Sequence, residues 1–245
     1  MSIADKITAI QNAKEDVRTS ANDAFSISIP ASAKLAEFPS YFVPAGCYTS
    51  APTASGVYIK YVGGKYSDYN VVWSGKTPVG VSIKTSTIAF TLHPSEQYGY
   101  QAKSSKVLIS GMQTLDASTY NQPSIAIYSK EDTDAAIASG YTVPAYSWAR
   151  NLVYTDGSVG SLMCGAQIQA IWDNISMVNT ALTSIGGTTM QTNAANGYWL
   201  SAQIYANNNI EHSYWAGREY GTTYAVFSGT NPMSTTIIAR STSDF

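Results

Sequence analysis

One strongly periodic helical segment lies between two long stretches of β-type sequence, and this order constrains the fold more than any other feature. Large apolar side chains recur in it at spacings of three and four: Ile168, Ile171, Trp172, Ile175, Val178, Leu182 and Ile185. This spacing predicts a helix over residues 164–185, which Gly186 and Gly187 end. We expect Asn174 to cap the second half of this helix.

Short strands are predicted on both sides of this helix. Runs of β-branched and aromatic residues, punctuated by Gly and Pro, stand at GVYIKYV, VVWSGKTPVGVSI, TIAFTL, KVLISGM and SIAIYS before it, and at GYWLSAQ, TTYAVFS and TTIIARS after it. A shorter helix is predicted over residues 133–139, capped by Asp132 and ended by Gly140. The expected fold class is therefore α+β, with few helices and many short strands.

A further helix is predicted at the N-terminus. Ser2 and Asp5 make a start that resembles a capping box. Apolar residues then recur at alternating spacings of four and three, a heptad pattern interrupted by Lys14: Ile3, Ile7, Ile10 and Val17. Isoleucine at both seam positions favours a trimeric coiled coil. A lone amphipathic helix packed on its own domain fits the same spacing.

Prolines at positions 30, 39 and 44 interrupt the stretch that follows, so regular helix or central strand is excluded there. We expect an N-terminal helix and linker over residues 1–50, serving oligomerisation or attachment, and a ligand-binding domain over residues 51–245. Cys47 and Cys164 have neither a CxxC spacing nor a neighbouring histidine. Two buried thiols are expected, and a single bridge between them stays open.

Charge excludes several functions. The 14 basic and 16 acidic side chains give a net charge of −2, and Lys130 is the last lysine, so clustered cations for nucleic acid are missing. No apolar run is long enough to span a bilayer, and the charged N-terminus predicts no signal peptide. With His93 and His212 as the two histidines, we expect no catalytic residue, no metal site and no cofactor.

The last stretch, from Gly197 to Phe245, is rich in Tyr, Trp, Ser, Thr, Asn, Gly and Ala and contains no lysine. Rigid aromatic rings give contact area at a low cost in entropy, and small polar residues adapt their hydrogen bonds around them. This composition predicts a recognition surface. Tryptophans in helix or strand patterns are expected in the core instead: Trp73, Trp148, Trp172 and Trp199.

Several motifs follow one another across residues 56–245: GVYIKYVGGKY, W-x-GKTPVGVSI, DGS-x-GSL at Asp156–Leu162, N-x-AL-x-x-IGGT at Asn179–Thr188, YW-x-S at Tyr198–Ser201, and Arg240. Their order resembles the C-type lectin fold, in the formylglycine-generating-enzyme-like branch that includes the variable proteins of diversity-generating retroelements. The N-terminal SIADKITAIQNAKEDVR and LAEFPSYF also resemble the start of phage tail and baseplate-associated proteins.

The resemblance implies a receptor-binding protein whose C-terminal segment displays variable side chains on a lectin-type scaffold. In such proteins mutation of template adenines diversifies Asn codons, and an AAC codon mutated at its two adenines never encodes Lys, Glu, Gln, Met or Trp. The runs 204–210, 212–214 and 220–231 contain none of these five residues. Five residues that flank these runs are expected to be fixed or framework positions: Gln203, Glu211, Trp215, Arg218 and Glu219.

The expected ligand-binding, variable surface therefore consists of Tyr205, Asn207, Asn208, Asn209, His212, Tyr214, Tyr220, Thr222, Tyr224, Thr230 and Asn231. Its expected ligand is a bacterial cell-surface protein or glycan. The chain is expected to form a homotrimer and to join other virion proteins in a phage tail after cytoplasmic synthesis. Two alternatives stay open, namely a tail-associated glycan hydrolase that uses Glu211 or Glu219 and a purely structural virion protein.

The same resemblance does not extend to two activities of related proteins. Calcium-dependent sugar-binding lectins carry EPN, QPD or WND triplets, and this sequence contains none of them. Cys47 and Cys164 do not sit in the motif of the formylglycine-generating enzyme. Neither calcium-dependent sugar binding nor that oxidase activity is therefore expected.

Overall fold

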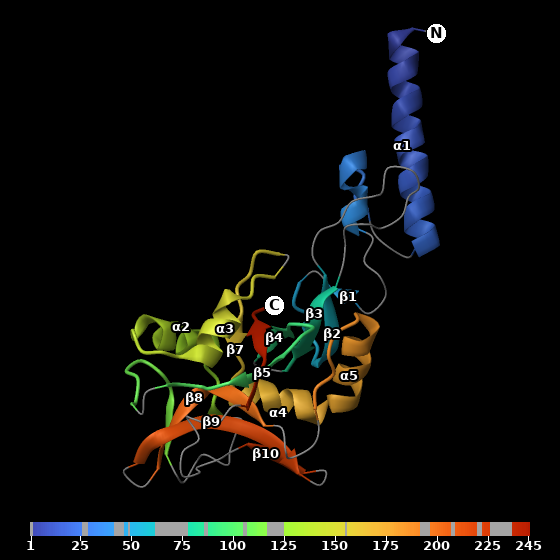
Figure 1. Cartoon of the computed structure of the whole chain (residues 1–245). Helices are drawn as coiled ribbons and strands as arrows, with labels where there is room; N and C mark the ends of the chain where they lie inside the picture. The colour runs from blue at the N-terminus through green and yellow to red at the C-terminus, as the bar shows by residue number, and fades with distance from the viewer. Residues whose placement is uncertain are drawn as a thin grey trace. The chain divides into compact units, whose positions relative to one another are not determined.

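The computed structural model describes residues 2–25, 29–41, 47–48, 50–61, 78–85, 88–104, 107–116, 125–154, 156–191, 197–206, 209–219, 222–225 and 237–245 (Figure 1). The chain divides into two compact units, Met1–Thr49 with Tyr61–Thr77 and Ser50–Lys60 with Pro78–Phe245. The sequence-based division at residues 50 and 51 differs from these units in placing 61–77 with the larger part, and it stays a prediction.

In the first unit, α1 (Ile3–Phe25) is the helix predicted from the heptad spacing. Its capping box forms as expected. The Ser2 N–H donates to Asp5 Oδ2 at 2.6 Å, and the Asp5 N–H donates to Ser2 Oγ at 3.1 Å. A 3₁₀ helix, η1 (Leu35–Tyr41), and the short β1 (Cys47–Tyr48) follow in the proline-interrupted stretch.

The apolar stripe of α1, formed by Ile3, Ile7, Ile10 and Val17, is exposed to solvent. These side chains have exposed fractions of 79%, 51%, 69% and 52%, respectively. The helix contributes Ala21 to a small core with residues of the segment that follows it: Ile29, Ala33 and Phe38. The described part of the chain therefore leaves the α1 stripe uncovered.

The first sheet of the second unit brings the end of the chain into its interior. Its strands run in the order β2 (Gly56–Tyr61), β3 (Pro78–Lys84), β4 (Ala89–Leu92), β12 (Ser241–Ser243) and β7 (Ser161–Leu162). β3 is antiparallel to β4, and β12 is antiparallel to both β4 and β7. Gly80 permits the close pairing, because a Cβ there would lie 1.8 Å from the Leu92 carbonyl oxygen.

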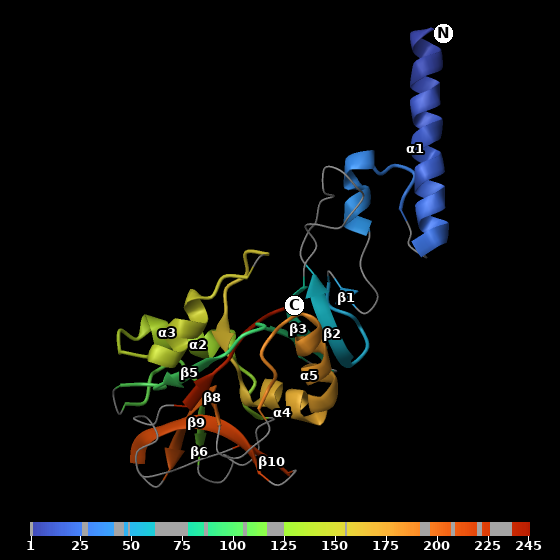
Figure 2. The ribbon, with the colours of Figure 1, turned by 45° about the vertical axis from the view of Figure 1, so that its right-hand side comes forward.

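The second sheet has β8 near its centre. Its order is β10 (Thr222–Ala225), β9 (Asn209–Glu219), β8 (Tyr198–Ala206), β11 (Ile237–Ala239) and β5 (Gln97–Tyr100). β6 (Thr114–Asp116) pairs with β8 in parallel, as β11 does. Figures 1 and 2 show β8, β9 and β10 as neighbouring strands on one side of this unit. β9 was not predicted as a strand from the sequence.

Four helices are described in the second unit: α2 (Lys130–Ala138), α3 (Pro144–Asn151), α4 (Gly165–Asp173) and α5 (Ile175–Ser184). The helix predicted over 164–185 is thus confirmed as two helices that meet at Asn174. Asn174 occupies the N-cap position of α5 as predicted, but its side chain makes no capping hydrogen bond there, because its amide donates to the Ala170 carbonyl oxygen at 2.9 Å. α4 contacts β8 and β10, and α5 contacts β3.

α2 corrects another prediction. It begins three residues earlier than expected, with Ser129 at the N-cap position, so Asp132 lies inside the first turn and is buried. Gly140 follows the helix with a φ of +74°, a conformation that glycine adopts without steric cost. The α+β class predicted from the sequence, with an N-terminal helix, is confirmed.

Two predicted strands are wrong. The described residues of the runs KVLISGM and SIAIYS, 107–112 and 125–129, contain no strand. Ile109 in the first run has its N–H and carbonyl bonded to the side chain of Gln203 rather than to a neighbouring strand. None of the described helices combines the length and apolar character that a membrane-spanning helix needs.

Candidate functional site

Six of the predicted surface positions fall on three adjacent strands. Tyr205 lies near the end of β8 with 39% of its surface exposed, whereas Asn209, His212 and Tyr214 lie in β9 and Thr222 and Tyr224 in β10. For β9 and β10 the structure describes the backbone, and the side chains of 206–237 lie outside the described residues. The remaining predicted positions also lie outside them: Asn207, Asn208, Tyr220, Thr230 and Asn231.

Strand pairing brings these six positions into one antiparallel ribbon. Asn209 is opposite Ala206 and His212 is opposite Ile204, across β8 and β9. Tyr224 is opposite Gly217 across β9 and β10. The register shifts twice between β8 and β9, once between Trp199 and Gln203 and once between Ile204 and Ala206. Such irregularities bend a strand and are common next to functional surfaces. We call β8, β9 and β10 together the display ribbon.

The first half of β8 is buried and hydrogen-bonded to surrounding elements. Tyr198, Trp199 and Leu200 are fully buried. Trp199 Nε1 donates to the Tyr100 carbonyl oxygen at 2.7 Å. The Tyr146 hydroxyl donates to the Ser201 carbonyl oxygen at 2.7 Å. Buried polar groups satisfied in this way fix one geometry, so the first half of β8 is a rigid base for the rest of the display ribbon.

The Gln203 side chain, two residues before Tyr205, forms four hydrogen bonds. Its Oε1 accepts from Lys103 Nζ at 3.1 Å and from the Ile109 N–H at 2.9 Å. Its Nε2 donates to the Ile109 carbonyl oxygen at 2.8 Å and to Thr114 Oγ1 at 3.0 Å. Burial lowers the pKa of Lys103 to about 8. Gln203 was predicted to be fixed, and this network gives a physical reason why replacing it would disturb the strand.

A second buried network joins β8 to the end of the chain. Arg240, between β11 and β12, forms an ion pair with Glu96 at 3.2 Å, and neither side chain is exposed. The guanidinium also donates to the carbonyl oxygens of Thr188 at 3.0 Å and His93 at 2.8 Å. The Tyr198 hydroxyl donates to Glu96 Oε2 at 2.9 Å. The pKa of Tyr198 is raised, first by burial and then by the Glu96 charge.

The DGS turn of the DGS-x-GSL motif is also held by polar contacts. Ser158 donates from its N–H and its hydroxyl to Asp156 Oδ1, at 3.0 and 2.6 Å. Lys60 on β2 forms an ion pair with Asp156 at 2.5 Å. Burial opposes ionisation of Asp156, but the bonds from Lys60 and Ser158 outweigh it and lower the pKa to about 2. The motif therefore has a structural role in this chain.

Two buried ionisable groups lie beneath β8. Asp132 accepts from the Gln113 N–H at 2.6 Å through Oδ1, while Oδ2 has no partner among the described residues. Burial raises the pKa of Asp132 to about 7. Cys164 is a free buried thiol, so it forms no disulfide bond with Cys47. Burial raises the pKa of Cys164 to about 12, so it stays a neutral thiol.

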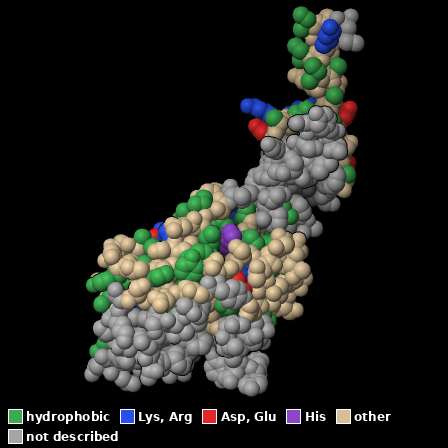
Figure 3. Space-filling view, in the orientation of Figure 1, with side chains coloured by type: hydrophobic (Ala, Val, Ile, Leu, Met, Phe, Trp, Pro, Cys, Tyr) green, Lys and Arg blue, Asp and Glu red, His purple; other side chains and the backbone are tan. Residues whose placement is uncertain are grey.

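The described residues contain no group of three or more His, Cys, Asp or Glu side chains that could hold a metal ion. His93 accepts from the Ser95 N–H through Nδ1, and burial lowers its pKa. Glu211 and Glu219 lie in β9, but the distance between their carboxylates lies outside what the structure describes. Figure 3 shows that Lys, Arg, Asp and Glu are sparse over the described part of this face of the second unit.

No protein-family model, curated protein or solved structure matches this chain.

Proposed function

We propose that this protein is a receptor-binding protein whose display ribbon carries the recognition surface. The observation that carries the proposal is the contrast within β8. Tyr198 to Gln203 are buried and bonded on several sides, while Tyr205 is exposed and leads into the two strands that hold five of the other predicted positions. A pre-ordered base lowers the entropy lost on binding, so exposed Tyr and Asn side chains can contribute to affinity.

The proposal includes a C-type lectin fold, diversification by a retroelement and a place in a phage tail. Its support is the sequence resemblance together with the roles of the motif residues. Arg240 forms a buried ion pair with Glu96, and Asp156 of the DGS turn forms an ion pair with Lys60 on β2. The Asn179 side chain hydrogen-bonds both the N–H and the carbonyl oxygen of Met190. Residues with such roles tolerate little change, which suits a fixed framework around variable positions.

Trimerisation through the α1 stripe is part of the same proposal. Four large apolar side chains at heptad spacing are exposed by half or more, and a helix of this kind is stabilised when it buries such a face. The occupant is a second and a third copy of the same helix. Three display ribbons on one particle would then strengthen binding through avidity.

The test uses the fluorescently labelled full chain on a panel of whole bacterial cells, followed by flow cytometry. The variant Tyr205→Ala/Tyr214→Ala/Tyr224→Ala removes three predicted contact rings. Its control, Tyr141→Ala, removes a tyrosine that is 46% exposed and belongs to none of the three strands of the display ribbon. On the cells that bind the unmodified chain, the first variant should lose at least about tenfold in affinity and the control should lose none.

Equal binding by both variants would contradict the proposal. The same cells test the enzymatic alternative, because a hydrolase would release soluble sugar from them. Release that disappears in Glu211→Gln or Glu219→Gln would assign catalysis to β9 instead.

A further inference from the structure

A thiol and a carboxamide, the side chains of Cys164 and Gln167, are held together at the start of α4. Cys164 occupies the N-cap position and Gln167 the third position of the helix. The Gln167 N–H donates to the Cys164 sulfur, and the Cys164 N–H donates to Gln167 Oε1 at 3.0 Å. These reciprocal bonds make a capping box, which folds both side chains over the same helical turn. A sulfur nucleophile and an acyl carbon are thus kept side by side.

Helix capping alone does not account for a cysteine at this position. Ser, Thr, Asp and Asn are the residues preferred at the N-cap, because their oxygen atoms are strong acceptors, whereas a thiol sulfur accepts only weakly. A serine in place of Cys164 would satisfy the Gln167 N–H better. What a cysteine offers beyond these residues is a far stronger nucleophile.

The Gln167 carboxamide is held through its oxygen. Besides the bond from the Cys164 N–H, the Thr242 hydroxyl lies 3.3 Å from Oε1 and can donate to it. Gln167 Nε2 forms no hydrogen bond with the described residues. Donors at a carbonyl oxygen stabilise the negative charge that develops there when a nucleophile attacks the carbonyl carbon. The amide is therefore polarised for acyl transfer, and its nitrogen is free to leave.

The pair is shielded from water. Cys164 and Thr242 have exposed fractions of 0%, and Gln167 has 2%. Burial raises the pKa of Cys164 to about 12, so the thiolate is scarce at neutral pH. A single intramolecular turnover does not need a populated thiolate, because a well-placed partner acts at an effective concentration of about 10⁵ M or more.

A buried carboxyl group near the thiol is available for proton transfer. Asp132 is 1% exposed, and its Oδ2 has no partner among the described residues. Its charge acts on Cys164, where it adds to the effect of burial on the pKa of the thiol. Burial raises the pKa of Asp132 itself to about 7, a value suited to taking up a proton and releasing it again.

We propose that Cys164 and Gln167 form an internal thioester. The sulfur bonds to Gln167 Cδ, the Cδ–Nε2 bond breaks, and the thiol proton leaves with the amide nitrogen as ammonia. The reaction needs no oxidant and no second substrate, and the escape of ammonia into solvent draws it forward. The product is an acylating group. When a primary amine attacks Cδ, an amide forms and Cys164 regains its thiol.

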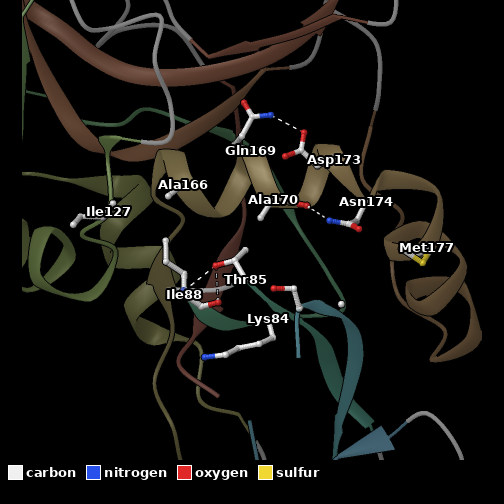
Figure 4. Close-up of a pocket in the computed structure, with 12 residues that line it drawn as sticks. Lys84, Thr85, Ile88, Ile127, Ala166, Gln169, Ala170, Asp173, Asn174 and Met177 are labelled. Atoms are coloured by element: carbon white, nitrogen blue, oxygen red, sulfur yellow. Dashed lines mark hydrogen bonds between the residues drawn. The ribbon is translucent and has the colours of Figure 1, made fainter. Parts of the chain in front are cut away.

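A cavity gives such an amine a route to this turn. Ala166, which precedes Gln167, lines a cavity of about 530 Å³, and Thr85 and Ile88 of the β3–β4 hairpin lie across from it (Figure 4). This volume falls within the range of roughly 300–1,000 Å³ that is usual for small-molecule sites. The substrates are therefore small primary amines or a lysine side chain. The thioester does not depend on the display ribbon or on the proposed function.

The test is the intact mass of the full chain, measured in denaturant at mildly acidic pH. The unmodified chain and Cys47→Ala should each be lighter than their sequences by one molecule of ammonia. Cys164→Ser, which keeps an N-cap acceptor, and Gln167→Glu, which keeps the capping box, should each have the full mass of their sequences. Methylamine should add to the unmodified chain at Gln167, as located by peptide fragmentation, and should make Cys164 reactive toward iodoacetamide.

A full mass for the unmodified chain, with Cys164 alkylated in denaturant before any amine is added, would overturn the proposal. So would the same loss of ammonia in Cys164→Ser, because the loss would then come from cyclisation at an asparagine. Failure here leaves the display ribbon untouched, since the cell-binding test uses other residues.

Discussion

Breaking the ion pair between Glu96 and Arg240 should strongly destabilise the second unit. Both side chains are fully buried at a separation of 3.2 Å, so solvent screens neither charge. Glu96→Gln removes the negative charge and leaves the Arg240 cation with the neutral carbonyl oxygens of Thr188 and His93. Removing one partner of a buried pair costs about 3–5 kcal/mol. We expect a loss of about 3 kcal/mol, because the new amide oxygen can still accept from the Tyr198 hydroxyl.

A double-mutant cycle isolates the pair. Arg240→Met leaves the Glu96 carboxylate buried without its cation and should cost about 3 kcal/mol or more, whereas Glu96→Gln/Arg240→Met removes both charges. The double variant should therefore be more stable than the sum of the single losses by at least about 2 kcal/mol. Urea unfolding at pH 7, followed through the fluorescence of the buried Trp172 and Trp199, measures each free energy. A single-variant loss below about 1 kcal/mol, or strict additivity, would refute the reasoning.

Three further predictions concern buried ionisable groups and assembly. Burial raises the pKa of Asp132 from 3.8 to about 7, so in that pH interval the folded protein holds a proton that the unfolded chain has lost. The free energy of unfolding should therefore fall by about 4 kcal/mol as pH rises through the interval. Urea titrations should show that Asp132→Asn abolishes this fall. Burial lowers the pKa of Lys103 from 10.5 to about 8, so the free energy of unfolding should rise by roughly 3 kcal/mol as pH increases from 8 to 10.5, and Lys103→Met should remove this rise. If the free energy of unfolding depends on pH in either variant as it does in the unmodified chain, the assignment to that residue is contradicted. Ile10→Asp on the α1 stripe should reduce the mass measured by light scattering from three chains to one, whereas Thr19→Asp, exposed elsewhere on α1, should not; a trimer that survives Ile10→Asp would show that other residues hold it together.

Local signals predicted the helices better than the strands. The spacing of apolar residues located α4 and α5, and the pair Ser2 and Asp5 located the start of α1, because these signals lie within a few residues of the structure they specify. Asn174 was correctly placed at the start of α5, but its side-chain amide bonds back to Ala170 in α4 rather than capping α5. That choice depends on how α4 and α5 meet, which the spacing does not contain.

Strand predictions failed where side chains from distant residues replace strand pairing. The run that contains Ile109 is apolar enough for a strand, yet the side chain of Gln203, 94 residues later, bonds both the N–H and the carbonyl oxygen of Ile109. β9 went unpredicted for the opposite reason, since its sequence mixes polar and aromatic residues, yet it pairs with all of β10 and with both ends of β8. β-propensity depends on such neighbours more than on the strand itself.

The recognition surface stays a prediction, whereas the buried residues that support its strands could not be predicted from the sequence. Composition alone pointed to the segment that holds Tyr205, Tyr214 and Tyr224. The residues that hold the segment in place were not evident, because Glu96 and Arg240 are 144 positions apart and Lys103 and Gln203 are 100 apart. Each looks like an ordinary surface residue until the fold brings it to its partner.

The most direct test of a variable recognition surface on a fixed scaffold is to sequence codons 197–245 of this gene across many sibling genomes, together with any nearby near-copy that could serve as template. The account predicts that substitutions concentrate between Tyr205 and Asn231 at template adenines, while Trp199, Gln203 and Arg240 stay unchanged. Substitutions that are scattered and mostly silent, or that fall on the buried framework as often as on the display ribbon, would contradict it.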